Sequence, residues 1–492
     1  MRFSSFSAWR RWLACGAPLA ALLGCAGLPA GSGPEFSSFV VMGEHGDAIV
    51  RVLIAAPACP LILLDRRPVA MQLRAGAATL ALRPTASDPQ DSKASAFPLL
   101  TCEMTLPPAS ASASVLGRAL ALPRAAPSRI VVIGDTGCRL KKSGDTYQSC
   151  NDADAYPFAQ VAAAAAAWKP DLVLHVGDYH YRENACPAAN AGCAGSSWGY
   201  GWDAWRDDFF KPGAALLQAA PWVMVRGNHE ICARAGQGFW RFLDPRPLLP
   251  GRDCGRAADD GNGDYSEPYA VALGGGAQLL VIDSASTSWK GFKPGAAGLA
   301  HYRADYLRLA ALARQMPYNI GLVHHPILGF GAERGADGSI ALRPGDAGLQ
   351  QAYGSQDAGL LPPSIQVMLS GHVHLWEQVS FASPHPSQFI AGFSGTAEDI
   401  VPLPASVPAD ATPAPGAVVE RLSSWVDGFG FMTMERRGPA QWEVSVRDRH
   451  GAVRNTCRID GSKSWCEQAQ VTSAPVTSGY MRAARNIPYA LK

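Results

Sequence analysis

The pattern of apolar and polar positions divides the chain into two regions. Over residues 36–125, short apolar runs at 48–54, 60–64 and 78–82 alternate with turn-rich stretches, and no helical period appears. Short apolar runs bounded by turns are typical of β-strands. The first region is therefore predicted to be a small, β-rich sandwich domain.

From residue 127 onwards the pattern becomes one of alternating strands and helices. An apolar run, an alanine-rich helical stretch and a second apolar run predict a βαβ unit, and hence an α/β (α+β) fold with a helix-covered sheet. The predicted strands are 129–133, 172–176, 222–226, 278–282, 320–323, 366–369, 430–435 and 442–447, and the predicted helices are 156–168 and 302–315. We expect this domain to span residues 127–450 and a cysteine-linked tail to span 451–492.

Composition narrows the class of protein. With 492 residues, 48% of them hydrophobic and 17% charged, the chain is long enough for several globular domains and unlike a disordered scaffold. The 43 Lys and Arg against 41 Asp and Glu give a net charge of +2, and three of the arginines lie within residues 1–24. A net charge so near zero gives no sign of the strongly basic surface that nucleic-acid binding requires. We therefore expect no nucleic-acid partner. Nothing in the sequence indicates a protein partner.

The first residues have the features of an export signal. Residues 1–25 begin with basic side chains and continue with an apolar run, 13–23, that is too short to span a bilayer. The run leads into Leu-Leu-Gly-Cys ending at Cys25, which resembles the bacterial lipobox and predicts a lipid anchor on that cysteine. Ordinary cleavage near Ala26 or Ala30 is the alternative. We expect a periplasmic or outer-membrane lipoprotein, or alternatively a secreted protein.

The cysteines agree with an oxidising compartment. Without Cys15 and Cys25, ten of the 12 cysteines remain, and no Cys-x-x-Cys motif occurs, which disfavours a thiolate zinc site. Disulfides are the better interpretation. Spacing does not determine connectivity, but sequence neighbours are the simplest pairing. The expected pairs are Cys59–Cys102, Cys138–Cys150, Cys186–Cys193, Cys232–Cys254 and Cys457–Cys466.

Polar side chains gather where the predicted strands end, which is where open α/β sheets place their sites. One such cluster alone is more often a turn than a ligand set. Five together offer the oxygen and imidazole donors that hard or borderline metal ions prefer. The clusters are Gly134-Asp135-Thr136-Gly137, Gly177-Asp178-Tyr179-His180-Tyr181, Gly227-Asn228-His229-Glu230, Val323-His324-His325-Pro326 and Gly371-His372-Val373-His374.

This ordered set of motifs resembles the purple acid phosphatases, a branch of the calcineurin-like metallophosphoesterases. The resemblance covers roughly residues 127–450, and Gly137 together with Tyr181 points to that branch. It implies a four-layer αββα metallophosphoesterase sandwich, here with the small N-terminal β-sandwich domain over 36–125.

The resemblance also implies a centre of two metal ions that share one carboxylate. The ligands of a ferric ion would be Asp135, Asp178, Tyr181 and His374, and those of a second, divalent ion would be Asp178, Asn228, His324 and His372. A phenolate is a hard, strongly donating ligand suited to Fe(III), whereas Asn and His suit Zn, Fe(II) or Mn. A metal-bound hydroxide would then attack the phosphorus of a small phosphoester.

Four further histidines are weighed against simpler roles. His229 is expected to contact the phosphate or to protonate the leaving group. His325 is either an outer-sphere substrate group or a solvent-facing residue. His180 is expected at the surface rather than near the phosphate, and His175 in the core. An aromatic-rich insertion between Tyr181 and Phe210 either stacks on the substrate or only packs locally.

The function expected from these features is hydrolysis of phosphate monoesters by an exported, acid phosphatase-like dimetal enzyme. A phosphodiesterase or nucleotidase using the same centre is the alternative within the enzymes. A non-catalytic surface binding protein is a further alternative, which the complete set of seven metal donors disfavours.

Overall fold

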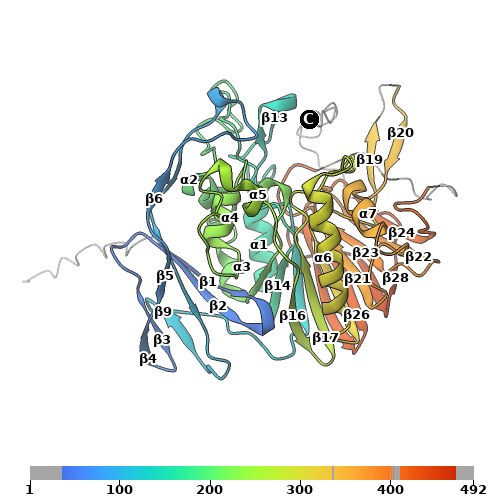
Figure 1. The fold of residues 1–492 in the computed structure, drawn as a ribbon, viewed down its shortest axis with the longest axis horizontal. Helices are drawn as coiled ribbons and strands as arrows, with labels where there is room; N and C mark the ends of the chain where they lie inside the picture. Colours follow the sequence, from blue (N-terminus) through green and yellow to red (C-terminus); the bar gives the residue numbers. More distant parts are fainter. Residues whose placement is uncertain (1–35, 335–336, 399–400, 402, 404–410, 473–492) are drawn as a thin grey trace, which may run out of the picture. The chain divides into compact units, whose positions relative to one another are not determined.

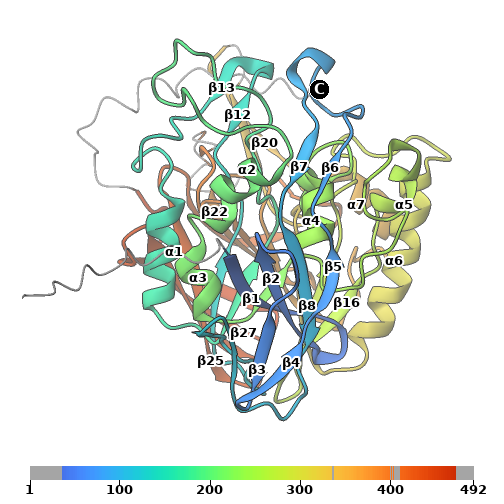
Figure 2. The same ribbon diagram turned by 90° about the vertical axis from the view of Figure 1, so that its left-hand side faces the viewer.

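Two β-sheets packed face to face form the centre of the computed structural model, and helices lie on their outer sides (Figures 1 and 2). The structure describes residues 36–334, 337–398, 401, 403 and 411–472. The predicted signal peptide and the lipid anchor at Cys25 lie outside these residues.

The larger sheet of the described residues has eleven strands in the order β28-β27-β26-β25-β11-β14-β15-β1-β2-β8-β5. Strands β11, β14, β15 and β1 are parallel, and the other neighbours are antiparallel. In the order of the sheet, the bounds are Lys463–Cys466, Val453–Asp460, Gln441–Asp448, Gly430–Gly438, Arg129–Ile133, Leu172–His175, Trp222–Met224, Phe36–Met42, Ala48–Ile54, Leu100–Thr105 and Gln72–Ala75.

The second sheet has seven strands in the described part of the chain, in the order β16-β17-β18-β21-β23-β22-β24. Strands β17, β18, β21 and β23 are parallel. In the order of the sheet, the bounds are Tyr269–Gly274, Ala277–Ile282, Tyr318–Val323, Ile365–Ser370, Ser387–Ala391, Trp376–Phe381 and Val419–Trp425.

Smaller sheets and the helices complete the fold. The four-stranded sheet β10-β9-β3-β4 comprises Arg118–Ala119, Ala113–Val115, Leu61–Leu64 and Arg67–Ala70. Two-stranded pairs are β6–β7 (Ala78–Leu80, Ser95–Phe97), β12–β13 (Leu140–Lys141, Thr146–Tyr147) and β19–β20 (Gly331–Arg334, Ile340–Arg343). The α-helices are α1 Phe158–Ala167, α2 Trp202–Trp205, α3 Ala214–Ala219, α4 Gly236–Phe242, α5 Asp260–Gly263, α6 Ala297–Ala313 and α7 Ala347–Gly354.

The alternation of side chains along each strand creates the layers. Ile130 and Val132 of β11 pack between the two sheets, in one core with Leu279 of β17. Val131, which points to the opposite face, packs instead with Phe158 of α1. A third core joins the outer face of the second sheet to α6 and α7. Because successive side chains of a strand face opposite sides, one apolar run serves two cores. The resulting order helix, sheet, sheet, helix confirms the predicted four-layer αββα fold.

The N-terminal region differs from the separate domain that the sequence predicted. Strand β1 pairs in parallel with β15, aligning Val41 with Trp222, and β2, β8 and β5 extend the same sheet. Strands from the N-terminal region and strands from residue 127 onwards therefore share the eleven-stranded sheet, whereas β3, β4, β9 and β10 form a small sheet of their own. The tail predicted from residue 451 likewise contributes β27 and β28 to the larger sheet.

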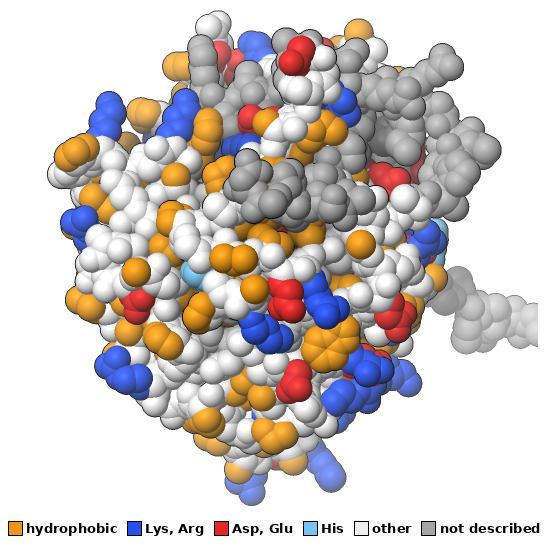
Figure 3. All heavy atoms as spheres, turned by 90° about the vertical axis from the view of Figure 1, so that its right-hand side faces the viewer, with side chains coloured by type: hydrophobic (Ala, Val, Ile, Leu, Met, Phe, Trp, Pro, Cys, Tyr) orange, Lys and Arg blue, Asp and Glu red, His pale blue; other side chains and the backbone are white. Residues whose placement is uncertain are grey.

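The described residues contain five disulfides, and these are the five predicted neighbour pairs. Their number indicates an extracellular or periplasmic protein. Within the same residues, no helix combines the length and apolar character needed to cross a bilayer. On the face shown in Figure 3, basic and acidic side chains lie among apolar and uncharged ones.

Candidate metal centre

The predicted polar clusters meet at one edge of the two central sheets. Each donor-bearing segment begins at or just after the carboxyl end of a strand, and the parallel strands of each sheet end on the same side. Asp135 follows β11, Asp178 follows β14, Asn228 follows β15, His324 follows β18 and His372 follows β21.

Three of these donors have an unusual backbone conformation. Asp135, Asp178 and His372 have φ angles of 55°, 59° and 71°, in the left-handed region that residues other than glycine rarely occupy. Such conformations concentrate at functional sites because the surrounding structure must hold them in place. Here they turn each side chain sharply out of its strand and towards the shared edge.

Two glycines allow the loops to approach one another. Gly177 has a φ of +102°, and a Cβ there would lie 2.5 Å from Nδ1 of His324. A Cβ at Gly227 would lie 2.1 Å from Oδ1 of Asp178. Any other residue at Gly227 would therefore push apart the loops that carry Asp178 and Asn228.

The first group of donors surrounds the Tyr181 hydroxyl. Its oxygen lies 2.8 Å from Oδ1 of Asp135, 2.9 Å from Oδ2 of Asp178 and 2.9 Å from Nε2 of His374. All four side chains are buried. Burial raises the pKa of Asp135, and burial together with the two carboxylates raises the pKa of Tyr181 well above its usual value. A cation would stabilise the ionised forms of these three acidic groups, so the donor set fits a metal ion.

The second group shares Asp178 with the first. Nε2 of His324 lies 3.1 Å from Oδ2 of Asp178 and 3.1 Å from Oδ1 of Asn228, and that amide oxygen lies 3.1 Å from Nδ1 of His372. The other nitrogen of His324 is 2.9 Å from the Val176 carbonyl, a contact that directs the Nε2 lone pair into the site. One carboxylate thus stands between two groups of candidate metal donors.

Two buried carboxylates fix the loops that carry these donors. Glu230 accepts hydrogen bonds from the backbone N–H groups of Asp178 at 3.1 Å, Tyr179 at 2.9 Å and Gly227 at 3.1 Å. Asp208 accepts from the Tyr181 N–H at 2.7 Å. Sequence analysis gave neither carboxylate a role, although Glu230 belongs to one of the motif clusters.

His229 lies beside the donors with partners of its own. Its backbone N–H donates to Oδ1 of Asp178 at 2.8 Å, whereas its imidazole Nε2 is 3.9 Å from Oδ2. Nδ1 is 3.2 Å from Oε1 of Glu183, and Glu183 also accepts a hydrogen bond from the Arg234 guanidinium. Burial and the Arg234 charge lower the pKa of His229 to about 3, against the effect of Glu183. Sequence analysis missed both Glu183 and Arg234.

The three other histidines that the sequence analysis weighed, His325, His180 and His175, are buried. His325 is 4% exposed, and its Nδ1 lies 2.9 Å from the Ser284 hydroxyl, so the solvent-facing alternative does not hold. His180 is also buried, 2.9 Å from the Gly199 carbonyl, and the predicted surface position is wrong. His175 is a core residue, as predicted: it stacks on Tyr179 with 3.8 Å between ring centroids.

The family model of the calcineurin-like phosphoesterases matches residues 128–375. The chain belongs to the calcineurin-like phosphoesterases.

Several solved structures resemble this calcineurin-like phosphoesterase at low sequence identity. The purple acid phosphatase PPD1 from yellow lupin (Lupinus luteus) seeds is 15% identical, with a TM-score of 0.48 over 90% of this chain and 77% of that one. PhoD is 11% identical, with a TM-score of 0.47 over 90% and 93%. GAP50, the anchor in the inner membrane complex of Plasmodium, is 11% identical, with a TM-score of 0.37 over 71% and 90%. None of the curated proteins matches the sequence.

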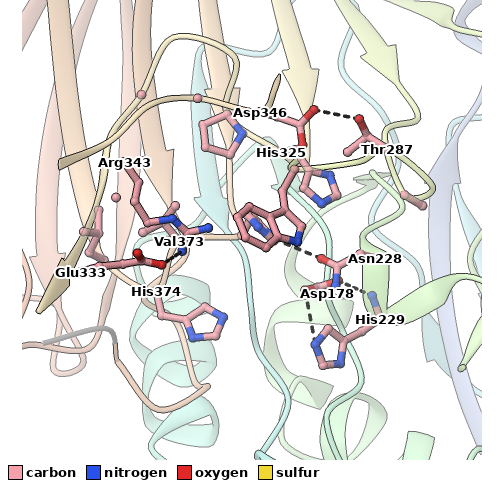
Figure 4. A pocket seen from close by; sticks show the side chains of 18 of the residues that line it. Asp178, Asn228, His229, Thr287, His325, Glu333, Arg343, Asp346, Val373 and His374 are labelled. Carbon is pink, nitrogen blue, oxygen red and sulfur yellow. Dashed lines mark hydrogen bonds and ion pairs between the residues drawn. The ribbon is translucent and has the colours of Figure 1, made fainter. Parts of the chain in front are cut away.

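A pocket of about 720 Å³ opens onto the donors of this calcineurin-like phosphoesterase. Asp178, Asn228, His229 and His374 point into it (Figure 4). Residues of the β12–β13 and β19–β20 hairpins line other parts of its wall.

The aromatic insertion after Tyr181 does not contribute to the pocket lining. Tyr200, Trp202 and Trp205 are buried in the core beneath the larger sheet, so the local-packing interpretation holds for them. Trp289, which sequence analysis did not single out, lines the pocket and is 43% exposed.

The buried side chain of Glu377 hydrogen bonds to the segment of the pocket wall that contains Phe330. Oε1 of Glu377 on β22 accepts a hydrogen bond from the Phe330 N–H at 2.9 Å, and burial raises the pKa of Glu377 from 4.5 to about 8. A folded-state pKa above the unfolded one contributes stability that is present below pH 4.5 and lost as the pH rises through 8. Glu377→Gln removes this titration. The free energy of unfolding of the variant minus that of wild type is therefore expected to rise by roughly 3 to 5 kcal/mol between pH 4.5 and pH 8.

Urea unfolding of the two proteins at a series of pH values measures this difference. The control is Glu420→Gln on the neighbouring strand β24, where the side chain is exposed. A difference between Glu377→Gln and wild type that does not change with pH would show that Glu377 is ionised in the folded protein.

Proposed function

We propose that the protein is an exported acid phosphatase-like enzyme that hydrolyses phosphate monoesters at a centre of two metal ions. The observation that carries the proposal is the position of Asp178 between two donor groups, 2.9 Å from the Tyr181 hydroxyl and 3.1 Å from Nε2 of His324. A centre of two metals can stabilise both the attacking and the leaving oxygen of a phosphoryl displacement.

The donor chemistry supports different metals in the two groups. Tyr181, with the carboxylates of Asp135 and Asp178, provides the hard anionic donors that suit Fe(III), and His374 completes that set. The second group has a carboxylate, an amide oxygen from Asn228 and two imidazoles, which suit a divalent ion such as Zn, Fe(II) or Mn. We assign the purple acid phosphatase type of centre on this basis.

The remaining residues of the site bind and orient the substrate. His229 projects into the pocket beside both donor groups, where it can hydrogen bond to a phosphate oxygen or transfer a proton to the leaving group. Glu183 contacts Nδ1 of this ring and thereby fixes its orientation. His325, held by Ser284, lines the same pocket and is assigned to the outer oxygens of the substrate.

Export is proposed from the leader and the disulfides together. Residues 1–25 have the features of a signal peptide, with Cys25 as the site of a lipid anchor. The described residues contain five disulfides, which agrees with folding in an oxidising compartment. Labelling with a radioactive or alkyne-modified fatty acid, compared between wild type and Cys25→Ala, tests the anchor.

A comparison of paired substrates tests the reaction itself. We expect the purified protein to release phosphate from p-nitrophenyl phosphate with a kcat/KM well above that for bis-p-nitrophenyl phosphate. A preference for the diester would instead favour the phosphodiesterase alternative. Activity on neither ester, in protein that contains two metal ions per chain, would contradict hydrolysis altogether.

Colour tests the ferric assignment. A phenolate bound to Fe(III) allows visible light to move charge from ligand to metal, so the protein is expected to be purple. Tyr181→Phe keeps the ring but removes the donor oxygen, and the visible band is expected to disappear while the circular dichroism spectrum persists. Metal analysis and an absorption spectrum of the purified proteins measure both properties.

Tyr179→Phe is the matched control. Tyr179 is equally buried, but its hydroxyl donates to the Val225 carbonyl at 2.9 Å and contacts none of the metal donors. This variant is expected to keep the band. A purple Tyr181→Phe protein, or a colourless wild type with two zinc or manganese ions, would overturn the assignment of Fe(III) to Tyr181.

A further inference from the structure

Basic side chains form one wall of the pocket. Arg139, Lys141 and Arg234 all line it. Arg139 directly precedes strand β12, Lys141 is its last residue, and Leu140 between them is fully buried. Because side chains alternate along a strand, Arg139 and Lys141 project from the same side, towards the cavity.

The three basic groups differ in their partners. The guanidinium of Arg234 pairs with Glu183. Nη2 of Arg139 lies 2.7 Å from Nδ1 of His374, so this arginine reaches the metal donors themselves. Within the described part of the chain, the Lys141 ammonium has no hydrogen bond and no ion pair, and this side chain is only partly exposed.

An ammonium group in this position is unfavourable without an anion beside it. Burial and the positive charges of Arg234 and Arg139 lower the pKa of Lys141, against the opposing effect of the more distant carboxylates of Glu183 and Asp178, neither of which pairs with the ammonium. A cation that is partly removed from water and faces further cations needs an anionic partner to offset the loss of hydration. The pocket is the side from which such a partner can come.

The next residue of the hairpin shows the contrast. Lys142 projects away from the pocket and pairs with Oδ2 of Asp91 at 2.7 Å, on the exposed surface. The two adjacent lysines therefore differ in whether a carboxylate of the protein pairs with them. Lys142 pairs with Asp91, whereas Lys141 faces the cavity without a carboxylate partner among the described residues.

We infer that Arg139 and Lys141 form a subsite for a second phosphoryl group of the substrate, so that the enzyme prefers small molecules with two phosphates over those with one. The inference rests on the proposed phosphoesterase function. Arg139 contacts the donor His374 and lines the same pocket as Lys141. A guanidinium and an ammonium together match a phosphate dianion, which has several acceptor oxygens. The pocket volume of about 720 Å³ accommodates such a molecule.

The second phosphate can belong to a phosphoanhydride or to a bisphosphate, and the substrates distinguish the two. ADP represents the first class, fructose 1,6-bisphosphate the second, and glycerol 3-phosphate is the reference with one phosphate. 3-Phosphoglycerate carries a carboxylate in place of a second phosphate. We measure kcat and KM for phosphate release from each, using the metal-loaded full-length protein.

For wild type we expect a higher kcat/KM on ADP or on fructose 1,6-bisphosphate than on glycerol 3-phosphate. Lys141→Met is expected to lower this preference about 10-fold or more, mainly through KM, since a group remote from the reacting bond contributes to binding. Lys141→Arg is expected to restore most of the preference. Lys142→Met, the matched control, is expected to leave the preference at the wild-type value.

Equal losses on all substrates would overturn the subsite, as would an unchanged preference or a loss confined to 3-phosphoglycerate. If the wild type hydrolyses none of the esters, the proposed function fails, and calorimetric binding of methylenediphosphonate and methylphosphonate decides the subsite separately. The subsite is supported if Lys141→Met binds methylenediphosphonate more weakly than wild type does but binds methylphosphonate equally well. Equal effects of the substitution on both phosphonates, or no effect, overturn it.

Discussion

Asp178→Ala is expected to remove nearly all phosphatase activity, by roughly 10³-fold or more in kcat. Oδ2 of this carboxylate lies 2.9 Å from the Tyr181 hydroxyl of the first donor group and 3.1 Å from Nε2 of His324 in the second. Alanine removes a ligand from each proposed metal at once, and water cannot keep the spacing between the two. Metal analysis is therefore expected to show lower occupancy of both ions along with the loss of turnover.

A carboxylate at the other end of the same strand provides the control. Asp171 precedes β14, is 6% exposed and accepts hydrogen bonds from the N–H groups of Ser128 and Arg129. Asp171→Ala is expected to lower thermal stability while it retains both metals. Should Asp178→Ala keep full metal content and near-normal turnover, the bridging role assigned to Asp178 is wrong.

The position of this site could be predicted from the sequence because the candidate donors directly follow strands, and apolar runs in the sequence predict those strands. The run at 129–133 matches β11, and the run at 172–176 matches β14 apart from its last residue, so Asp135 and Asp178 could be placed at one sheet edge. Tyr181 lies three residues beyond Asp178. The motifs are thus local in sequence, and local patterns are what a single sequence reveals.

The groups that position His229 and His325 could not be found in this way. Glu183 pairs with Arg234 across 51 residues of sequence, and Ser284 contacts His325 across 41. Neither pair has a characteristic spacing. Their roles depend on burial and on which loops meet, both of which are set by tertiary packing.

The N-terminal region, residues 36–125, also shows what a single sequence does not reveal. Its apolar runs predicted strands, and β2 begins and ends where the run at 48–54 does. The sequence did not reveal which sheet these strands join. That is decided by β1, whose partner β15 lies about 180 residues away, and a parallel neighbour so distant leaves no turn signal between the two strands.

His229→Ala is the second substitution with a large expected effect, and it separates catalysis from metal binding. We expect turnover to fall by about 10²-fold or more, as is typical when a positioned acid or phosphate donor is removed. Both metals are expected to remain. The imidazole Nε2 is 3.9 Å from Asp178, whereas each proposed ligand contributes to the donor groups at about 3 Å.

His180→Ala serves as the matched control for His229→Ala, because His180 is also a buried histidine but lies outside the pocket lining. It is expected to lower stability while kcat stays within a few-fold of wild type. Glu183→Gln provides a second comparison: it keeps the shape of the side chain but removes the charge that contacts Nδ1 of His229 at 3.2 Å. If Glu183 acts by positioning this ring, Glu183→Gln lowers kcat in wild type and has little further effect in the His229→Ala background. Loss of metal in His229→Ala would instead make His229 a ligand and shift the whole assignment of the second donor group.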